Sequence, residues 1–146
     1  MESSTMKKVL DAILSTAKVS GVHAVTDDAK VWSQLNQKDV PRIYVNLGPV
    51  TATRIAFSSV TSEDMEATAQ VTLDGVVQTR TPGALATTMD SIMSKVITAM
   101  ESLTVSGVTV LDCYLVSMDY DKDAEANYGI FRGVFRVRYL YNHLAP

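Results

Sequence analysis

The sequence predicts an α+β fold, with two helices packed on one face of a mainly antiparallel, mixed β-sheet that ends in a long C-terminal hairpin. Three observations predict it. Two segments repeat apolar residues at helical spacing, several others alternate apolar and polar residues, and the strands come in runs between the helices. The 146 residues contain no linker or break in composition, so we expect one domain, residues 1–146.

The two predicted helices cover about Thr5 to Val19 and Ala84 to Leu103. Apolar residues recur in each at three and four positions, which places them on one face. The second stripe is wide enough to cover a sheet. Each helix runs into a Val-Ser-Gly-Val segment, at residues 19–22 and 105–108. We attribute this small repeat to shared capping chemistry, because glycine adopts the left-handed turn that ends many helices.

The strand predictions rest on period-two alternation and on turn signals. Gly48-Pro49 is expected to end one strand, residues 50–65 to form a loose strand and a polar loop, and Asp74-Gly75 to form a turn or bulge. The segment 108–120 is apolar on both faces, which predicts a central strand. The predicted strands are Val22–Thr26, Pro41–Leu47, Glu66–Leu73, Val108–Tyr120 and Tyr128–Tyr141.

Charge and composition exclude several classes of protein. The chain is 47% hydrophobic and 20% charged, as globular domains are. Its net charge of −3 lacks the basic balance of a nucleic-acid reader. Cys113 is the only cysteine, so there is no internal disulfide, and it is predicted to be buried. We find no signal-peptide pattern and no apolar run of about 18 residues, and therefore expect a reducing cytoplasm and no membrane contact.

No familiar catalytic or cofactor motif is present. The two histidines, His23 and His143, lie outside any active-site pattern, and there is neither a Gly-x-Ser-x-Gly elbow nor a glycine-rich phosphate loop. Within the acidic turn region Asp119–Asn127, the cluster Asp119–Asp123 has carboxylates at alternate positions, as a calcium loop does, but Ala124 and Ile130 stand where glycine and a bidentate glutamate are needed. We therefore predict no enzyme activity, cofactor or metal, and a solvated acidic hairpin tip.

The last predicted strand carries a charged face. Arg132, Arg136 and Arg138 alternate with the apolar residues, and acidic residues lie across the expected hairpin. A phosphate-binding ladder is one interpretation, but cross-strand salt bridges or a seam between subunits fit better. A two-helix layer leaves one sheet face and the edges for self-assembly. The candidate interface residues are Arg54, Phe57, Asp119, Asp121, Asp123, Arg132, Arg136 and Arg138.

The order of elements resembles the tail terminator proteins of long-tailed bacteriophages over most of the chain. An amphipathic helix and a short strand lead through a connection bearing Trp32 to the strand Pro41–Val45. The alternating strand Ala67–Leu73, a helix over residues 90–100 and a closing strand, Phe135–Tyr139, follow. The resemblance rests on element order, length and hydrophobic pattern, and it assigns no role to a single residue.

This resemblance implies a virion protein that is assembled in the host cytoplasm. It implies a homohexameric ring on the last ring of the tail tube, where the protein stops tube polymerisation and offers the surface that joins the head. The implied partners are the tail tube protein and a head–tail connector protein, with DNA only passing through the lumen. Two alternatives stay open: a head–tail completion or tail tube protein of similar fold, and a small cytoplasmic ligand-binding or enzyme domain.

Overall fold

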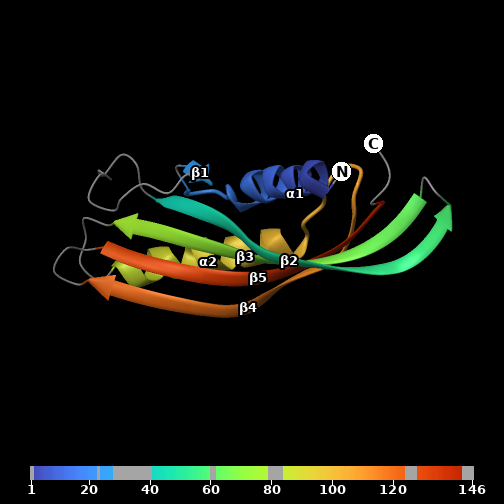
Figure 1. Cartoon of the computed structure of the whole chain (residues 1–146). Helices are drawn as coiled ribbons and strands as arrows, with labels where there is room; N and C mark the ends of the chain where they lie inside the picture. Colours follow the sequence, from blue (N-terminus) through green and yellow to red (C-terminus); the bar gives the residue numbers. More distant parts are fainter. Residues whose placement is uncertain are drawn as a thin grey trace.

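Two helices and five strands make up the described part of the chain in a computed structural model, which covers residues 2–22, 24–27, 41–59, 62–78, 84–123 and 128–142. Figure 1 shows them in chain order. They are α1 (Glu2–Ala17), β1 (Ala24–Thr26), β2 (Arg42–Ser59), β3 (Ser62–Gln78), α2 (Ala84–Glu101), β4 (Thr109–Asp123) and β5 (Tyr128–Asn142).

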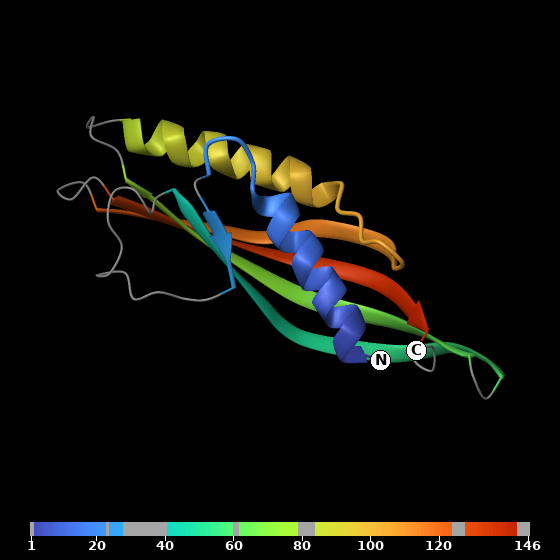
Figure 2. The same cartoon turned by 90° about the horizontal axis from the view of Figure 1, so that it is seen from above.

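The five strands form one sheet in the order β1-β2-β3-β5-β4. β1 pairs with β2 in parallel, and the other three pairs are antiparallel. The helices lie over one face, with α1 crossing β2 and β3 and α2 following the length of the sheet (Figure 2). The predicted fold class, a mainly antiparallel mixed sheet with a long C-terminal hairpin, is confirmed.

The core lies between this face and the two helices. Alternate residues of β3 and β5 point into it, because successive side chains of a strand point to opposite faces. α2 packs onto them with the stripe that its spacing predicts. The largest fully buried side chains include Ile13, Leu73, Met89, Met93, Phe131, Phe135 and Tyr139.

Both helices end in the same kind of turn. In α1 the Val22 amide donates to the Val19 carbonyl at 3.1 Å, and beyond α2 the Val108 amide donates to the Val105 carbonyl at 3.2 Å. The glycine in each turn has a positive φ, 96° and 77°, as a type II turn requires of its third residue. α1 ends at Ala17 and α2 at Glu101, so both predicted helices are two residues too long at their C-terminal ends.

Four sequence predictions about the strands are wrong. β2 continues through Gly48-Pro49. The register of pairing with β3 shifts between Leu47 and Val50, and proline, which has no backbone N–H to donate, is tolerated at such an irregularity. The segment 50–65 is consequently strand apart from residues 60 and 61, which lie outside the described part. β4 is an edge strand and not a central one.

Asp74-Gly75 is also not a turn, since β3 passes straight through it. Gly75 lies opposite Phe131 of β5, and the Phe131 ring fills the position that a Cβ atom on Gly75 would take. An aromatic ring that covers a glycine on the neighbouring strand is a known way of stabilising such a position in a sheet. The close approach of the Phe131 ring to the backbone of β3 therefore explains why residue 75 is a glycine.

We predict that Gly75→Ala destabilises the fold by about 1 to 3 kcal/mol, since the new methyl group overlaps a rigid, fully buried ring. Gly133→Ala is the matched control in β5. There the nearest atoms are the flexible end of Met118 at 3.1 Å and Cε1 of the Phe135 ring at 3.2 Å, which need to move by only a few tenths of an ångström, so the expected loss is smaller than for Gly75→Ala. Urea unfolding of both variants measures the difference, and equal losses would show that the Phe131 ring yields freely.

Candidate functional site

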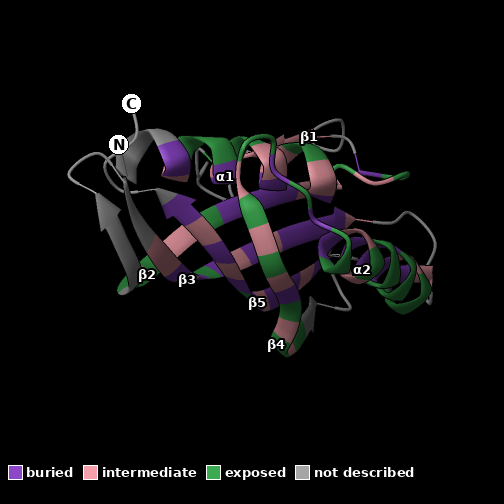
Figure 3. Ribbon diagram, turned by 90° about the vertical axis from the view of Figure 1, so that its right-hand side faces the viewer, coloured by how far each residue is buried: buried purple, intermediate pink, exposed green. Residues whose placement is uncertain are grey.

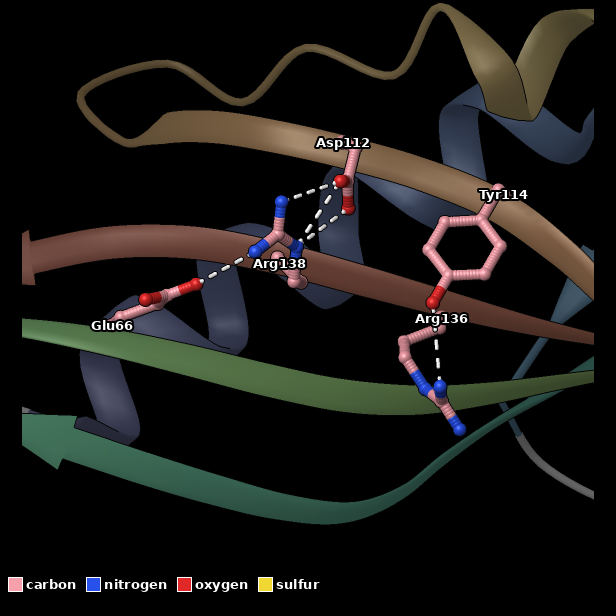
Figure 4. Close-up of polar contacts among 5 residues, drawn as sticks. All are labelled: Glu66, Asp112, Tyr114, Arg136 and Arg138. Carbon is pink, nitrogen blue, oxygen red and sulfur yellow. Dashed lines mark hydrogen bonds and ion pairs between the residues drawn. The ribbon is translucent and has the colours of Figure 1, made fainter.

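The face of the sheet opposite the helices, called here the open face, carries most of the charged strand residues. There Arg138 of β5 lies between Asp112 of β4 and Glu66 of β3 (Figure 4). Its guanidinium donates to both Asp112 oxygens, with Nη2 2.7 Å from Oδ2, and Nη1 lies 3.0 Å from Oε1 of Glu66. Asp112 stands opposite Arg138 in the register, so the predicted cross-strand salt bridge is confirmed here.

Arg132 forms a second cross-strand pair, but with a partner that the sequence reading did not name. Its Nε and Nη2 atoms lie 2.6 and 3.2 Å from the two oxygens of Asp74, which stands opposite it in β3. Asp119 stands opposite on the β4 side. The hydrogen bond to Asp74, the charge of Asp74 and then the charge of Asp119 raise the pKa of Arg132.

Arg136 differs from its two neighbours. Its Nη1 atom donates to the hydroxyl of Tyr114 at 3.3 Å (Figure 4), and no carboxylate among the described residues forms an ion pair with it. Both side chains are exposed. Arginine and tyrosine are enriched at the energetic centres of protein interfaces. Of the three arginines, Arg136 is therefore the one whose charge is available to a partner.

The eight candidate interface residues do not form one site. The three arginines lie along the middle of β5, whereas Arg54 and Phe57 pair with Met65 and Glu63 near the distal end of the β2–β3 hairpin. Asp119, Asp121 and Asp123 belong to the far end of β4, which extends further than the sequence predicted. The side chains of Arg54, Phe57, Asp121 and Asp123 lie outside the described part.

The outer edge of β4 is a feature that the sequence reading missed. All four large apolar or aromatic side chains found exposed in the described part belong to this strand: Leu111, Tyr114, Val116 and Tyr120, which are 41 to 52% exposed. Figure 3 shows this strand in front with its exposed residues in green. Tyr114 stands opposite Arg136 on the open face and Tyr120 opposite Phe131 on the helix side, so these side chains lie on both faces of a free edge strand. Exposed apolar side chains along such an edge are typical of a docking surface.

Two bulges shape this edge. The register between β4 and β5 shifts between Val110 and Asp112 and again between Leu115 and Ser117, so Leu111 and Val116 have no residue opposite them. A bulge bends a strand and re-aims the extra side chain. Both unpaired residues are exposed, at 42 and 48%, as are Tyr114 and Tyr120, which do have partners in the register.

The buried thiol and the hollow between α2 and β4 do not bring a nucleophile and a base together. Cys113 is buried as predicted, and its burial, with the nearby charges of Asp112 and Glu101, raises its pKa to about 12. An open hollow of about 370 Å³ between α2 and β4 is lined by Met89, Asp90 and Tyr120 among others. Within the described residues, no three metal-ligating side chains gather, and no helix is long and apolar enough to cross a membrane.

Comparison with known proteins gives matches in structure and none in sequence. No model of a protein family matches this chain, and no curated protein matches it. Among solved structures, a chain of the "Virion of native gene transfer agent (GTA) particle" is similar over 93% of this chain and 91% of that one, with 16% identity and a TM-score of 0.49. A likeness of this size concerns the fold alone and does not indicate a function.

The Arg138 network makes stability depend on pH. The hydrogen bond from Arg138, and then its charge, hold the pKa of Asp112 below its usual 3.8 despite some desolvation. Because the folded-state pKa is lowered, the stabilisation is complete above the unfolded-state value and is lost as the pH falls through the folded-state value. Asp112→Asn should therefore lower the free energy of unfolding at pH 7, and the gap to the unmodified chain should narrow below pH 3.8.

Urea unfolding at pH 7 and near pH 2.5 measures this gap. Asp90→Asn, on the exposed side of α2, is the control and should change the free energy of unfolding little at either pH. A gap that stays constant between the two pH values would contradict an Arg138–Asp112 contribution.

Proposed function

We propose that this chain is a structural protein of a phage-type virion that forms a ring on the end of the tail tube. The ring stops tube polymerisation and offers the surface to which the head is joined. The observation that supports it best is the sheet itself, which has helices on one face only and exposed apolar side chains along a free edge. Such a sheet is built to contact other protein chains.

The charged groups of the open face support protein contact in preference to catalysis. Two of the three arginines are already neutralised by carboxylates of the same chain, so they are not held ready for a substrate. A reaction site needs a nucleophile or a base aimed into a pocket with a few converging polar groups. The hollow beside Tyr120 holds one carboxylate on mainly apolar walls. We therefore propose that the protein is not an enzyme.

The element order that underlies the resemblance to tail terminators agrees with the described fold. The N-terminal helix, the short strand, the long β2–β3 hairpin, the second helix and the closing hairpin follow one another as expected. The proposed partners are other copies of this chain in a hexamer, the tail tube protein on one side of the ring and a head–tail connector protein on the other. DNA passes through the lumen, where a net charge of −3 would not retain phosphates.

A tail tube or head–tail completion protein is the second candidate. The same free edge of β4 supports it, because an edge that joins subunits within a ring is equally useful in a tube. The two functions differ in what the isolated protein does. A tube protein stacks ring upon ring, whereas a terminator stops at a single ring.

We predict discrete single rings of six subunits when the purified chain is examined by native mass spectrometry and negative-stain electron microscopy at increasing concentration. Long stacked tubes would favour the tube protein instead. A chain that stays monomeric at high concentration would contradict the proposed function.

The open face yields a separate prediction. Arg136→Glu should weaken self-association or docking to the tube about tenfold or more, because it reverses the charge available to a partner without breaking an internal ion pair. Lys18→Glu, an exposed residue next to the end of α1, makes the same charge change and serves as the control. Sedimentation velocity and circular dichroism measure association and folding.

Arg138→Glu serves a different purpose. It brings a third carboxylate next to Asp112 and Glu66, so it should also lower stability. A loss of assembly in that variant alone would be a folding effect. If Arg136→Glu assembles like the unmodified chain, the open face is not a seam.

A further inference from the structure

The sheet has two free edges, and they lie on opposite sides of it. At one side β4, over its 15 residues Thr109–Asp123, has β5 as its only neighbour among the described strands. At the other side β1 covers only the first three of the 18 residues of β2. From Val45 to Ser59, β2 has no partner on its outer side among the described strands. The two free lengths are therefore closely matched.

The two edges carry opposite charge. β4 contains four aspartates and one lysine, a formal net charge of −3, of which the Asp112 charge is already paired with Arg138 of β5. The free part of β2 contains Arg54 and no acidic residue, and β2 as a whole adds Arg42. Opposite charges placed across a strand pair stabilise it, whereas like charges destabilise it. Pairing of an acidic edge with a basic edge is therefore more favourable than pairing of two acidic edges or of two basic edges.

Strand direction agrees with this match. From β2 to β3, from β3 to β5 and from β5 to β4 the chain reverses direction each time, so β4 runs antiparallel to β2. A second copy placed beside the first in the same orientation thus offers its β2 antiparallel to β4. Antiparallel pairing is the more common and slightly the more stable arrangement.

We infer that copies of this chain join head to tail, with β4 of one copy pairing antiparallel with the segment Val45–Ser59 of β2 in the next. This inference rests on the proposed function and specifies how the ring subunits meet. Pairing would cover the exposed side chains of Leu111, Val116 and Tyr120 and satisfy the free backbone groups of both strands. Because the two surfaces differ, the contact repeats from copy to copy, and it closes into a ring when the rotation between neighbours returns to the first copy.

A two-fold contact is the competing arrangement. It would set β4 against β4 and oppose two strands of net charge −3. It would also leave both β2 edges free and stop at a dimer. Charge therefore favours the head-to-tail contact.

Two blocked variants separate these arrangements. The first carries Leu111→Lys and Val116→Lys, which adds positive charge at the two exposed bulge positions of β4. The second carries Thr51→Glu and Ala52→Glu, which adds negative charge at exposed positions of the free β2 segment. Thr98→Lys and Thr98→Glu, on the exposed side of α2, are the matched controls for added charge. Circular dichroism and urea unfolding establish that every variant folds.

The head-to-tail inference predicts that each blocked variant alone is monomeric and that an equimolar mixture forms a one-to-one heterodimer and nothing larger. In that mixture one intact β4 edge meets one intact β2 edge. Native mass spectrometry distinguishes the species, since the variants differ in mass. The Thr98 variants should assemble as the unmodified chain does.

Other outcomes overturn the inference in recognisable ways. If the β2 variant dimerises while the β4 variant stays monomeric, two copies of β4 pair with each other. If both variants still form rings, the seam lies elsewhere and the proposed ring function stands. If the unmodified chain is monomeric, the proposed function itself fails.

Discussion

The register between β3 and β5 is the constraint on which the rest of the structure depends. It sets fifteen consecutive residue pairs without a shift and places the aromatic residues of β5 under the helices and its arginines on the open face. A slip by one residue would exchange the two faces and bury three guanidinium groups. The ion pairs of Arg132 with Asp74 and of Arg138 with Glu66 act across this same ladder, so the charged face and the core are specified together.

Much of this arrangement could be predicted from the sequence because it follows from local periodicity. The alternation in β5 identifies both its buried side and its charged side, and the spacing in α2 identifies the stripe that is buried against the sheet. Asp112 was correctly expected across the hairpin from the arginines. Its position opposite Arg138 follows from hairpin geometry once the two strands are known. The Val-Ser-Gly-Val segments likewise form the same turn twice.

What could not be predicted depends on how distant strands are placed in the sheet. β4 has apolar residues on both faces, which favours a central strand, yet it lies at the edge of the described sheet with β5 as its neighbour. Two bulges then turn Leu111 and Val116 outward, and no residue pattern in the sequence predicts these bulges. The pairing of Asp74 with Arg132 could not be predicted for a similar reason, because the two residues are 58 positions apart in the sequence. The sequence also gives no sign that β2 passes through Gly48-Pro49.

The Phe131 ring that lies on Gly75 has a consequence for how the sheet can change over evolutionary time. The two positions share a single volume, so neither is free to vary by itself. A side chain can appear at the glycine position only in a lineage where the ring has already shrunk, and a smaller residue at the ring position leaves a hollow that favours such a replacement. Distant relatives of this chain should therefore show substitutions at these two sites as linked pairs, large with small in either order.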